Sequence, residues 1–446
     1  MSIASILPPE IIGAIAAEAR SKRRVRYQIP LEVVFSHVCH HWREVTIGTP
    51  LLWATIGVYS GSSMKWLPSY LDRSKPCLLD VRIDTYDDEK RWGASLVTPY
   101  SLIFQLLANH FERVQYFFWF ARSESFISAL CGPHFKDIPA PALERFCVLA
   151  THWQNLIPRK DQELVPSIFA GCAPRLSLVD LGATQSLPPL QNVTTMMLGH
   201  MFTQYELMRN RLVRIESSAP NLMHLSIGPV GPPQEQTISL IFNSLRSLKL
   251  NGDPAFVTGF LGDLEAPQLE SLWFGGSRYI SLQPLLSHGK FPDKFPLLRY
   301  LTLQNHDFPN LVAFALEFPS VTHLHLLYPR GGGRGLTSMI RPDHVEPVLW
   351  PHLHTLAIQT LHDAYNSNSN NAVPENFIGQ CRDFISYRRR MNNGVMTLLF
   401  DSDLFKIAVR GDLLNVVGMT LATISRDNYQ EYWWNLFEDN TLHIVQ

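Results

Sequence analysis

The residues best suited to chemistry in this 446-residue chain are two short pairs. Asp401 and Asp403 stand two apart near the end of an apolar run, where two carboxylates could share acid–base work, although such residues more often serve turns and helix caps. His323 and His325 also stand two apart, so on a strand both would face one side. Zinc needs a third and a fourth ligand, which cannot be named from the sequence. We therefore expect the two histidines to make surface contacts.

Other patterns that carry chemistry are missing. The sequence contains no GxSxG, HExxH or GxGxxG. The run Arg330–Gly335 is rich in glycine but lacks the order of a phosphate loop, so it predicts a flexible surface loop, with an RNA-contacting segment as the alternative. The 6 cysteines are scattered with no CxxC pair, which excludes a disulfide framework or a cysteine zinc site and fits a reducing compartment. We predict a chain that is not an enzyme and needs no cofactor and no metal.

Composition narrows the class of protein. A hydrophobic content of 46% with 17% charged residues is typical of a globular chain. The formal net charge of −1 favours neither nucleic acid nor an anionic membrane as a partner. Pro8, Pro9 and Glu10 interrupt any signal-peptide pattern, and the uncharged stretch 92–111 contains Pro99 and polar residues, which indicates a buried helix. The expected location is cytoplasmic and/or nuclear; the basic run 22–26 predicts a solvated loop, with a nuclear signal as the alternative.

These residues need elements to position them, and the first such elements lie at the N-terminus. Pro8 and Pro9 suit the first turn of a helix, and Glu10 suits the positive end of its dipole. Pro30 opens a second helical pattern, which Gly48 and Pro50 end. Its apolar residues form one continuous stripe: Leu31, Val34, Phe35, Val38, Trp42 and Val45. Leu51, Leu52 and Trp53 would then pack back on the helices.

Three short helices make a very small core. Domains of this size are marginal alone. We therefore expect part of their apolar surface to be covered by a partner or by the chain that follows. Trp42 and Trp53 are expected to hold the small domain together.

This N-terminal segment resembles an F-box. The match rests on Leu7-Pro8 with Glu10-Ile11-Ile12, on Val38-Cys39-x-x-Trp42-Arg43, and on Pro50-Leu51-Leu52-Trp53. The basic stretch 20–26 departs from the short loop usual there. The resemblance implies a substrate receptor of an SCF-type cullin–RING ubiquitin ligase, whose F-box docks on a Skp-family adaptor. The residues expected to bind that adaptor are Leu7, Pro8, Ile11, Ile12, Leu31, Val34 and Val38.

A pattern of the form L-x-x-L-x-L recurs through the rest of the chain, about every 27 residues. Many copies have a proline two residues before the first apolar position, which we expect to set an extended start for a short strand. The result would be short parallel strands joined by return segments. The copies begin at Leu78, Val114, Leu143, Leu176, Val193, Leu222, Leu245, Leu269, Leu298, Val321, Leu353 and Val395.

These copies resemble the irregular leucine-rich repeats of fungal F-box proteins, although the asparagine of the regular repeat is absent. The alternative is a set of unrelated buried strands in an α/β domain. The expected fold class is α/β: a helical F-box at 1–56, a linker helix at 57–75, and a leucine-rich-repeat solenoid at 76–446. A helix is expected after Pro374, and the aromatic run 432–437 is expected to cap the stack.

In such a repeat, the apolar positions one, four and six point into the stack, and positions three and five point to the concave face. In the middle copies this would bring Trp273, Tyr300, Thr302, His323 and His325 into one patch. An exposed Trp and Tyr beside polar neighbours is typical of a binding hot spot, so we predict that this patch contacts the ubiquitination target. The alternative is that Trp273 fills a cleft against the return segments.

Taken together, the sequence predicts a substrate-recognition adaptor that binds a Skp-family adaptor, a cullin–RING ligase and an unidentified protein substrate. The alternative is a leucine-rich-repeat scaffold that has no link to a ubiquitin ligase.

Overall fold

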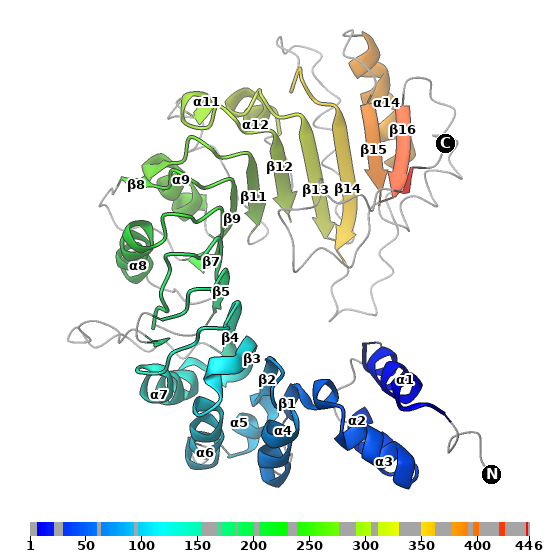
Figure 1. Ribbon diagram of the computed structural model, residues 1–446. Helices are drawn as coiled ribbons and strands as arrows, with labels where there is room; N and C mark the ends of the chain where they lie inside the picture. The colour runs from blue at the N-terminus through cyan, green and yellow to red at the C-terminus, as the bar shows by residue number, and fades with distance from the viewer. Residues whose placement is uncertain are drawn as a thin grey trace. The chain divides into compact units, whose positions relative to one another are not determined.

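The computed structural model divides the chain into two compact units, residues 1–201 and residues 202–446. Both units are α/β, with parallel strands and helices in the connections (Figure 1). The domain boundaries predicted at residues 56 and 75 fall within the first unit and stay predictions. The structure describes residues 7–21, 30–59, 64–92, 97–152, 168–169, 172–182, 186–199, 205–230, 239–252, 254–275, 291–304, 311–329, 349–361, 377–390, 396–400, 419–423 and 443–444.

The first unit begins with helices and continues into a parallel sheet in the order β1-β2-β3-β4-β5-β6. Its helices are α1 (Pro9–Ser21), α2 (Leu31–Ser36), α3 (His40–Ile47), α4 (Leu67–Arg73), α5 (Tyr86–Trp92), α6 (Val97–Ala108) and α7 (Glu124–Phe135), with 3-10 turns η2 (Pro50–Trp53), η3 (Met64–Trp66) and η5 (Phe111–Arg113). Its strands are β1 (Thr55–Tyr59), β2 (Leu79–Asp84), β3 (Val114–Ser123), β4 (Arg145–His152), β5 (Leu178–Leu181) and β6 (Thr195–Leu198).

The second unit repeats the strand–connection–strand scheme. Its main strands are β7 (His224–Val230), β9 (Ser247–Gly252), β11 (Ser271–Gly275), β12 (Tyr300–Gln304), β13 (His323–Pro329), β14 (Thr355–Leu361), β15 (Met396–Phe400), β16 (Met419–Thr423) and β17 (His443–Ile444), adjacent in that order. β17 is antiparallel to β16. A small pair, β8 (Leu240–Ile241) and β10 (Leu264–Glu265), lies apart. The helices are α8 (Tyr205–Ser218), α9 (Pro254–Asp263), α11 (Phe291–Lys294), α12 (Leu311–Glu317) and α14 (Phe377–Arg390).

The recurring proline serves a turn and not an extended start. In the copy that leads to β4, Pro141 lies between Ala140 and Leu143, and the Leu143 amide donates to the Ala140 carbonyl at 3.1 Å. Proline at the second position of such a turn is favoured because its φ is already fixed near the required value. The same bond recurs around Pro174, Pro220, Pro267, Pro296, Pro319 and Pro351. Each of these seven copies therefore enters its strand from a tight turn.

The register of the strands follows the sequence pattern. Positions four and six of one copy pair with positions four and six of the next: Leu272 with Leu301, and Phe274 with Leu303. These side chains are fully buried. In the first unit, Phe104 of α6 and Phe135 of α7 pack on this face. In the second unit, Phe314 of α12 and Phe318, which follows this helix, pack on Phe274. The prediction of short parallel strands in register is confirmed.

Two details of the prediction are wrong. Leu78 was expected in the stack, yet it is 41% exposed, and Leu79 takes its place because the register between β2 and β3 shifts there. The stripe expected as one helix is broken at residues 37–39, where Cys39 is extended with φ −160° and ψ 175°. The break is stable because the Arg43 Nε donates to the Ser36 carbonyl at 2.8 Å, and this carbonyl would otherwise lack a partner at the helix end.

The helix expected after Pro374 is present as α14, and its predicted stripe is buried at Cys381, Phe384 and Ile385. Arg388 does more than face the negative end of the helix. It is buried and donates to the carbonyls of Leu349, Trp350 and Leu353, the turn that leads into β14. The glycine-rich loop, Asp401 and Asp403, and the aromatic run 432–437 lie outside the described residues.

Candidate protein-binding surfaces

The N-terminal helices form a small core of their own. Ile12 and Ala16 of α1, Trp42 of α3 and Trp53 of η2 are each less than a tenth exposed. Trp42 packs against the Phe35 ring with centroids 5.4 Å apart. The Trp53 indole donates to the Thr46 carbonyl at 2.8 Å. The burial of both tryptophans agrees with the structural role predicted for them.

The same helices turn large apolar side chains to solvent. Of the 14 exposed large apolar side chains of the described chain, 6 lie between residues 11 and 51. A stretch this short would carry far fewer if exposed apolar residues were spread evenly. Contiguous exposed apolar surface on a soluble protein commonly marks a contact with a partner. These side chains, the apolar docking set, are Ile11 (47% exposed), Ile15 (40%), Val34 (40%), Val38 (49%), Ile47 (39%) and Leu51 (63%).

The residues predicted to bind an adaptor divide into three groups. Pro8, Ile11, Val34 and Val38 are exposed, and Leu7 and Leu31 are partly exposed. Ile12 is fully buried, because it lies about 100° around the helix from Ile11 and faces the core. It therefore cannot contact a partner, and its inclusion among the contact residues is wrong.

Polar contacts tie this helical block to the rest of the first unit. The buried Tyr70 hydroxyl of α4 donates to Glu32 of α2 at 2.8 Å, and its ring meets Trp53 edge-on with centroids 4.9 Å apart. The Arg73 guanidinium lies over the Trp53 ring, 4.5 Å from its centroid. These contacts hold the N-terminal helices against α4, so the exposed side of the helices has a fixed orientation on the first unit.

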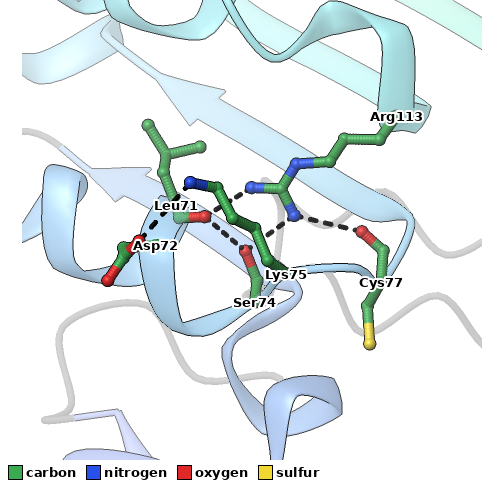
Figure 2. A network of polar contacts seen from close by, with 6 residues as sticks. All are labelled: Leu71, Asp72, Ser74, Lys75, Cys77 and Arg113. Carbon is green, nitrogen blue, oxygen red and sulfur yellow. Dashed lines mark hydrogen bonds and ion pairs between the residues drawn. The ribbon is translucent and has the colours of Figure 1, made fainter.

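The other end of α4 is held by Arg113. Its guanidinium donates to the Leu71 carbonyl, to the Ser74 hydroxyl at 3.0 Å and to the Cys77 carbonyl at 3.1 Å (Figure 2). Burial lowers the pKa of Arg113, although a guanidinium keeps its charge at any ordinary pH. The charged fork therefore satisfies the carbonyls at the end of α4 and in the segment that leads to β2. Arg388 does the same for the turn before β14.

The second predicted surface has the predicted register but not the predicted exposure. Trp273 pairs with Thr302, and Thr302 pairs with His325, so these side chains form one row across β11, β12 and β13. However, Trp273 is 1% exposed, Thr302 4% and His325 0%. The expectation of an exposed tryptophan is wrong. Tyr300 and His323 of the neighbouring row remain partly exposed, and their rings lie 4.7 Å apart.

The burial of Trp273 has identifiable contacts. The Lys249 ammonium of β9 lies over its ring, 3.8 Å from the centroid, and its indole donates to the Gln304 amide oxygen at 3.2 Å. Burial lowers the pKa of Lys249 to about 8. Burial also lowers the pKa of His323 to about 4 and that of His325 to about 3, so both histidines are neutral near pH 7. Lys249, which pairs with Trp273, is the cation of this row, and Thr302 and His325 offer hydrogen bonds and packing without charge.

One exposed surface was missed from the sequence. Phe118 of β3 is 37% exposed and lies between Arg82 of β2 and Cys147 of β4 on the face of the first sheet opposite α6 and α7. The alternation of Tyr116, Phe118 and Phe120 was the available signal, since every second residue of a strand shares a face. Phe118 stands outside the L-x-x-L-x-L positions of its copy, so the repeat pattern alone does not select it.

In the described ranges, no three His, Cys, Asp or Glu side chains gather to hold a metal ion. The helices of those ranges include none that is both long and apolar enough to cross a membrane.

No protein-family model matches the chain, and no curated protein matches it. Among solved structures, a protein from Bacteroides fragilis, determined as a structural genomics target, is similar to 38% of this chain at 14% sequence identity with a TM-score of 0.26. The similarity spans 60% of that protein's length. No function is transferred from a similarity of this size.

Proposed function

We propose that this chain is a substrate-recognition adaptor of an SCF-type cullin–RING ubiquitin ligase. Its N-terminal helices would act as the F-box that docks on a Skp-family adaptor, and its parallel strands would act as leucine-rich repeats that hold the target protein. In this role the chain performs no catalysis, because ubiquitin transfer is done by other subunits. The role places it in the cytoplasm and/or the nucleus.

The observation that carries the proposal is the apolar docking set. Helices that must be stable in water bury their apolar stripes, and here Trp42, Trp53 and Ile12 already fill the core. The outward residues include Ile11, Val34 and Val38, three of the positions expected to contact the adaptor. Buried apolar anchors are the residues that usually dominate a protein–protein interface.

The rigid base supports the same proposal. A ligase adaptor must hold its target at a set distance from the catalytic subunits, since proximity governs the rate of transfer. The contacts of Glu32 with Tyr70, of Arg73 with Trp53, and of Arg113 with the end of α4 fix the helical block on the first sheet. In the second unit, the target contacts would fall on Tyr300 and His323, with Trp273, Thr302 and His325 packed in the neighbouring row of the same face.

The alternative function is a leucine-rich-repeat scaffold without a ubiquitin ligase. In this function the parallel strands still act as repeats, and the apolar docking set contacts a partner other than a Skp-family adaptor. The two functions differ in one measurable respect, which is the affinity for a purified Skp-family adaptor.

The test is the double variant Ile11→Ala with Val34→Ala in the full chain. Both side chains are exposed, so the melting temperature should stay close to that of the wild type, while truncation of two anchors should weaken adaptor binding at least ~30-fold, given about 1.4 kcal/mol per decade. Isothermal titration calorimetry with the purified adaptor measures the loss.

The matched control is Leu102→Ala with Leu106→Ala on α6, which removes two exposed leucines away from the helical block. This variant should bind the adaptor like the wild type. Wild-type chain that does not bind the adaptor, or a folded docking variant that binds it unchanged, would refute the ligase role and favour the scaffold.

A further inference from the structure

The apolar docking set comes from separate helices. Ile11 and Ile15 belong to α1, Val34 belongs to α2, and Val38 lies between α2 and α3. A partner can meet all of these side chains at once only if α1 and α2 keep one fixed arrangement, because a surface that is already arranged for its partner loses less freedom on binding. The contacts that fix α1 therefore affect binding as well as the exposed side chains do.

The buried side chains of α1 fix its rotation more firmly than its position along its own axis. Ile12 and Ala16 stand four residues apart on one stripe of the helix and are 0% and 1% exposed. Apolar burial is not directional, so this stripe determines which side of α1 faces the core. It resists a shift along the helix axis less well, and such a shift is best prevented by a directional contact at one end of the helix.

A directional contact of this kind lies at the start of α1. The Nε2 atom of His41, in the first turn of α3, lies 2.9 Å from the Leu7 carbonyl oxygen. A carbonyl oxygen only accepts, so Nε2 carries the proton and donates. Leu7 directly precedes Pro8, whose carbonyl accepts from the Ile11 amide at 3.1 Å and so closes the first turn of α1. The His41 bond therefore ties the beginning of α1 to α3.

The same turn of α3 also holds α2. The Arg43 Nε donates to the Ser36 carbonyl at the end of α2. His41 and Arg43 thus reach, from positions two apart on one short helix, the two helices that carry most of the docking set. The N-terminal pattern that resembles an F-box leaves the position of His41 open, so the resemblance does not select this residue.

We propose that His41 is a positioning residue for adaptor binding. By holding the Leu7 carbonyl, it sets the position of α1 and therefore of Ile11 and Ile15, and it acts through these side chains without contacting the adaptor. This inference rests on the proposed function and adds to it a residue outside the docking set.

The first test compares replacements of His41 in the full chain, titrated with the purified Skp-family adaptor in a calorimeter. His41→Leu keeps bulk but loses the donor, and it should bind about 5-fold more weakly, which is about 1 kcal/mol. His41→Gln places an amide N–H near the position of Nε2 and should bind within about 2-fold of the wild type. His41→Asn is shorter and should bind like His41→Leu. The matched control is His40→Leu, at a neighbouring side chain that is 80% exposed, and its affinity should equal that of the wild type.

The second test separates positioning from a general loss of structure. With Ile11→Ala and Ile15→Ala already present, His41→Leu should cost less than about 2-fold, because the anchors that it positions are gone. With Val34→Ala and Val38→Ala present instead, it should still cost about 5-fold. A merely structural role for His41 would give the same loss on both backgrounds.

Hydrogen exchange of the chain without the adaptor gives an independent measure. His41→Leu should speed exchange of the Ile11 and Ile12 amides, which bond to the Pro8 carbonyl, and should leave the Gly48 amide at the end of α3 unchanged. Wild-type chain that does not bind the adaptor would refute the ligase function and this role together. If the wild type binds, the inference alone fails when His41→Leu binds equally well, when its loss is the same on both backgrounds, or when exchange in the first turn of α1 does not change.

Discussion

The same strand positions differ in burial between the sheets of the two units. In the first unit, burial alternates along the strands, so that β2 buries Leu79, Val81 and Ile83 and leaves the residues between them accessible. In the second unit, β11 buries Leu272, Trp273, Phe274 and Gly275 in succession. Strands with one open face normally alternate, whereas strands covered on both faces do not. The first sheet therefore has an open face along β2, whereas the second sheet covers the corresponding face at β11.

Phe118 and Trp273 both stand at position five of their copies, and they differ in exposure. Each is a large aromatic side chain on the face opposite the core leucines, yet Phe118 is 37% exposed and Trp273 is 1% exposed. Trp273 has Lys249 over its ring and Gln304 at its indole nitrogen. The type of residue at such a position does not decide whether it can bind a partner; its neighbours across the sheet do.

The largest predicted effect tests this pair directly. Trp273→Ala should lower the free energy of unfolding by about 3–5 kcal/mol, because it opens a cavity among buried side chains. Phe118→Ala should cost less than about 1 kcal/mol, since the ring keeps a large exposed fraction. Urea denaturation followed by tryptophan fluorescence and circular dichroism measures both. Equal losses in the free energy of unfolding would show that the difference in exposure between Phe118 and Trp273 is not matched by a difference in stability.

A smaller effect is expected from a pair of glycines. A Cβ at Gly275 would lie 1.9 Å from the Asn251 side-chain oxygen and 3.1 Å from that of Gln304, on the covered face of the second unit. Gly275→Ala should therefore cost about 1–3 kcal/mol. A Cβ at Gly57 would lie 2.7 Å from the Tyr59 ring, a side chain that is partly exposed on the open face of the first unit.

Gly57→Ala should thus be neutral or stabilise by up to about 1 kcal/mol, because alanine loses less chain entropy than glycine in a strand. Chemical denaturation of the two variants under the same conditions gives the comparison. A Gly57→Ala variant that loses as much stability as Gly275→Ala would mean that Tyr59 is held as firmly as Asn251.

The core of the fold follows from the sequence, because it depends on local pattern. Positions four and six of each copy lie on one face of a strand, and identical spacing in the next copy brings Leu272 to Leu301 and Leu324 to Leu356. In seven copies, the turn that starts the strand has one proline at its second position. Both are short-range properties, so they can be inferred without knowing what the rest of the chain does.

The sites are less predictable because they depend on distant residues. The exposure of Trp273 is set by Lys249 and Gln304, which lie one strand away on either side. The helix break at Cys39 needs Arg43 to reach back to the Ser36 carbonyl. Ile12 and Ile11 differ only in which side of α1 meets α3. In each case the sequence shows the residue type but not its partner.

The smallest predicted effect is a difference in pH dependence between the two units. The pKa of Asp180 is raised to about 7 in the first unit, so between about pH 4 and 7 the folded state binds more protons than the unfolded state, and stability falls as pH rises. The pKa of His323 is lowered to about 4 in the second unit, first by burial and then by His354. Between about pH 4 and 6.5 the unfolded state binds more protons, and stability rises with pH.

Substitutions that remove each titration should therefore act in opposite directions. Relative to the wild type, Asp180→Asn should be more stabilising at pH 8 than at pH 5, because the wild type holds a poorly solvated carboxylate at pH 8. His323→Gln should be more favourable at pH 5 than at pH 8, because the wild type must keep a neutral imidazole at pH 5. Each difference is expected to be on the order of 1 kcal/mol, from about 1.4 kcal/mol per unit of pKa reduced by partial exposure. The urea midpoints of the wild type and both variants at the two pH values measure this difference. Trends of the same sign for the two variants would show that Asp180 and His323 lie in similar surroundings.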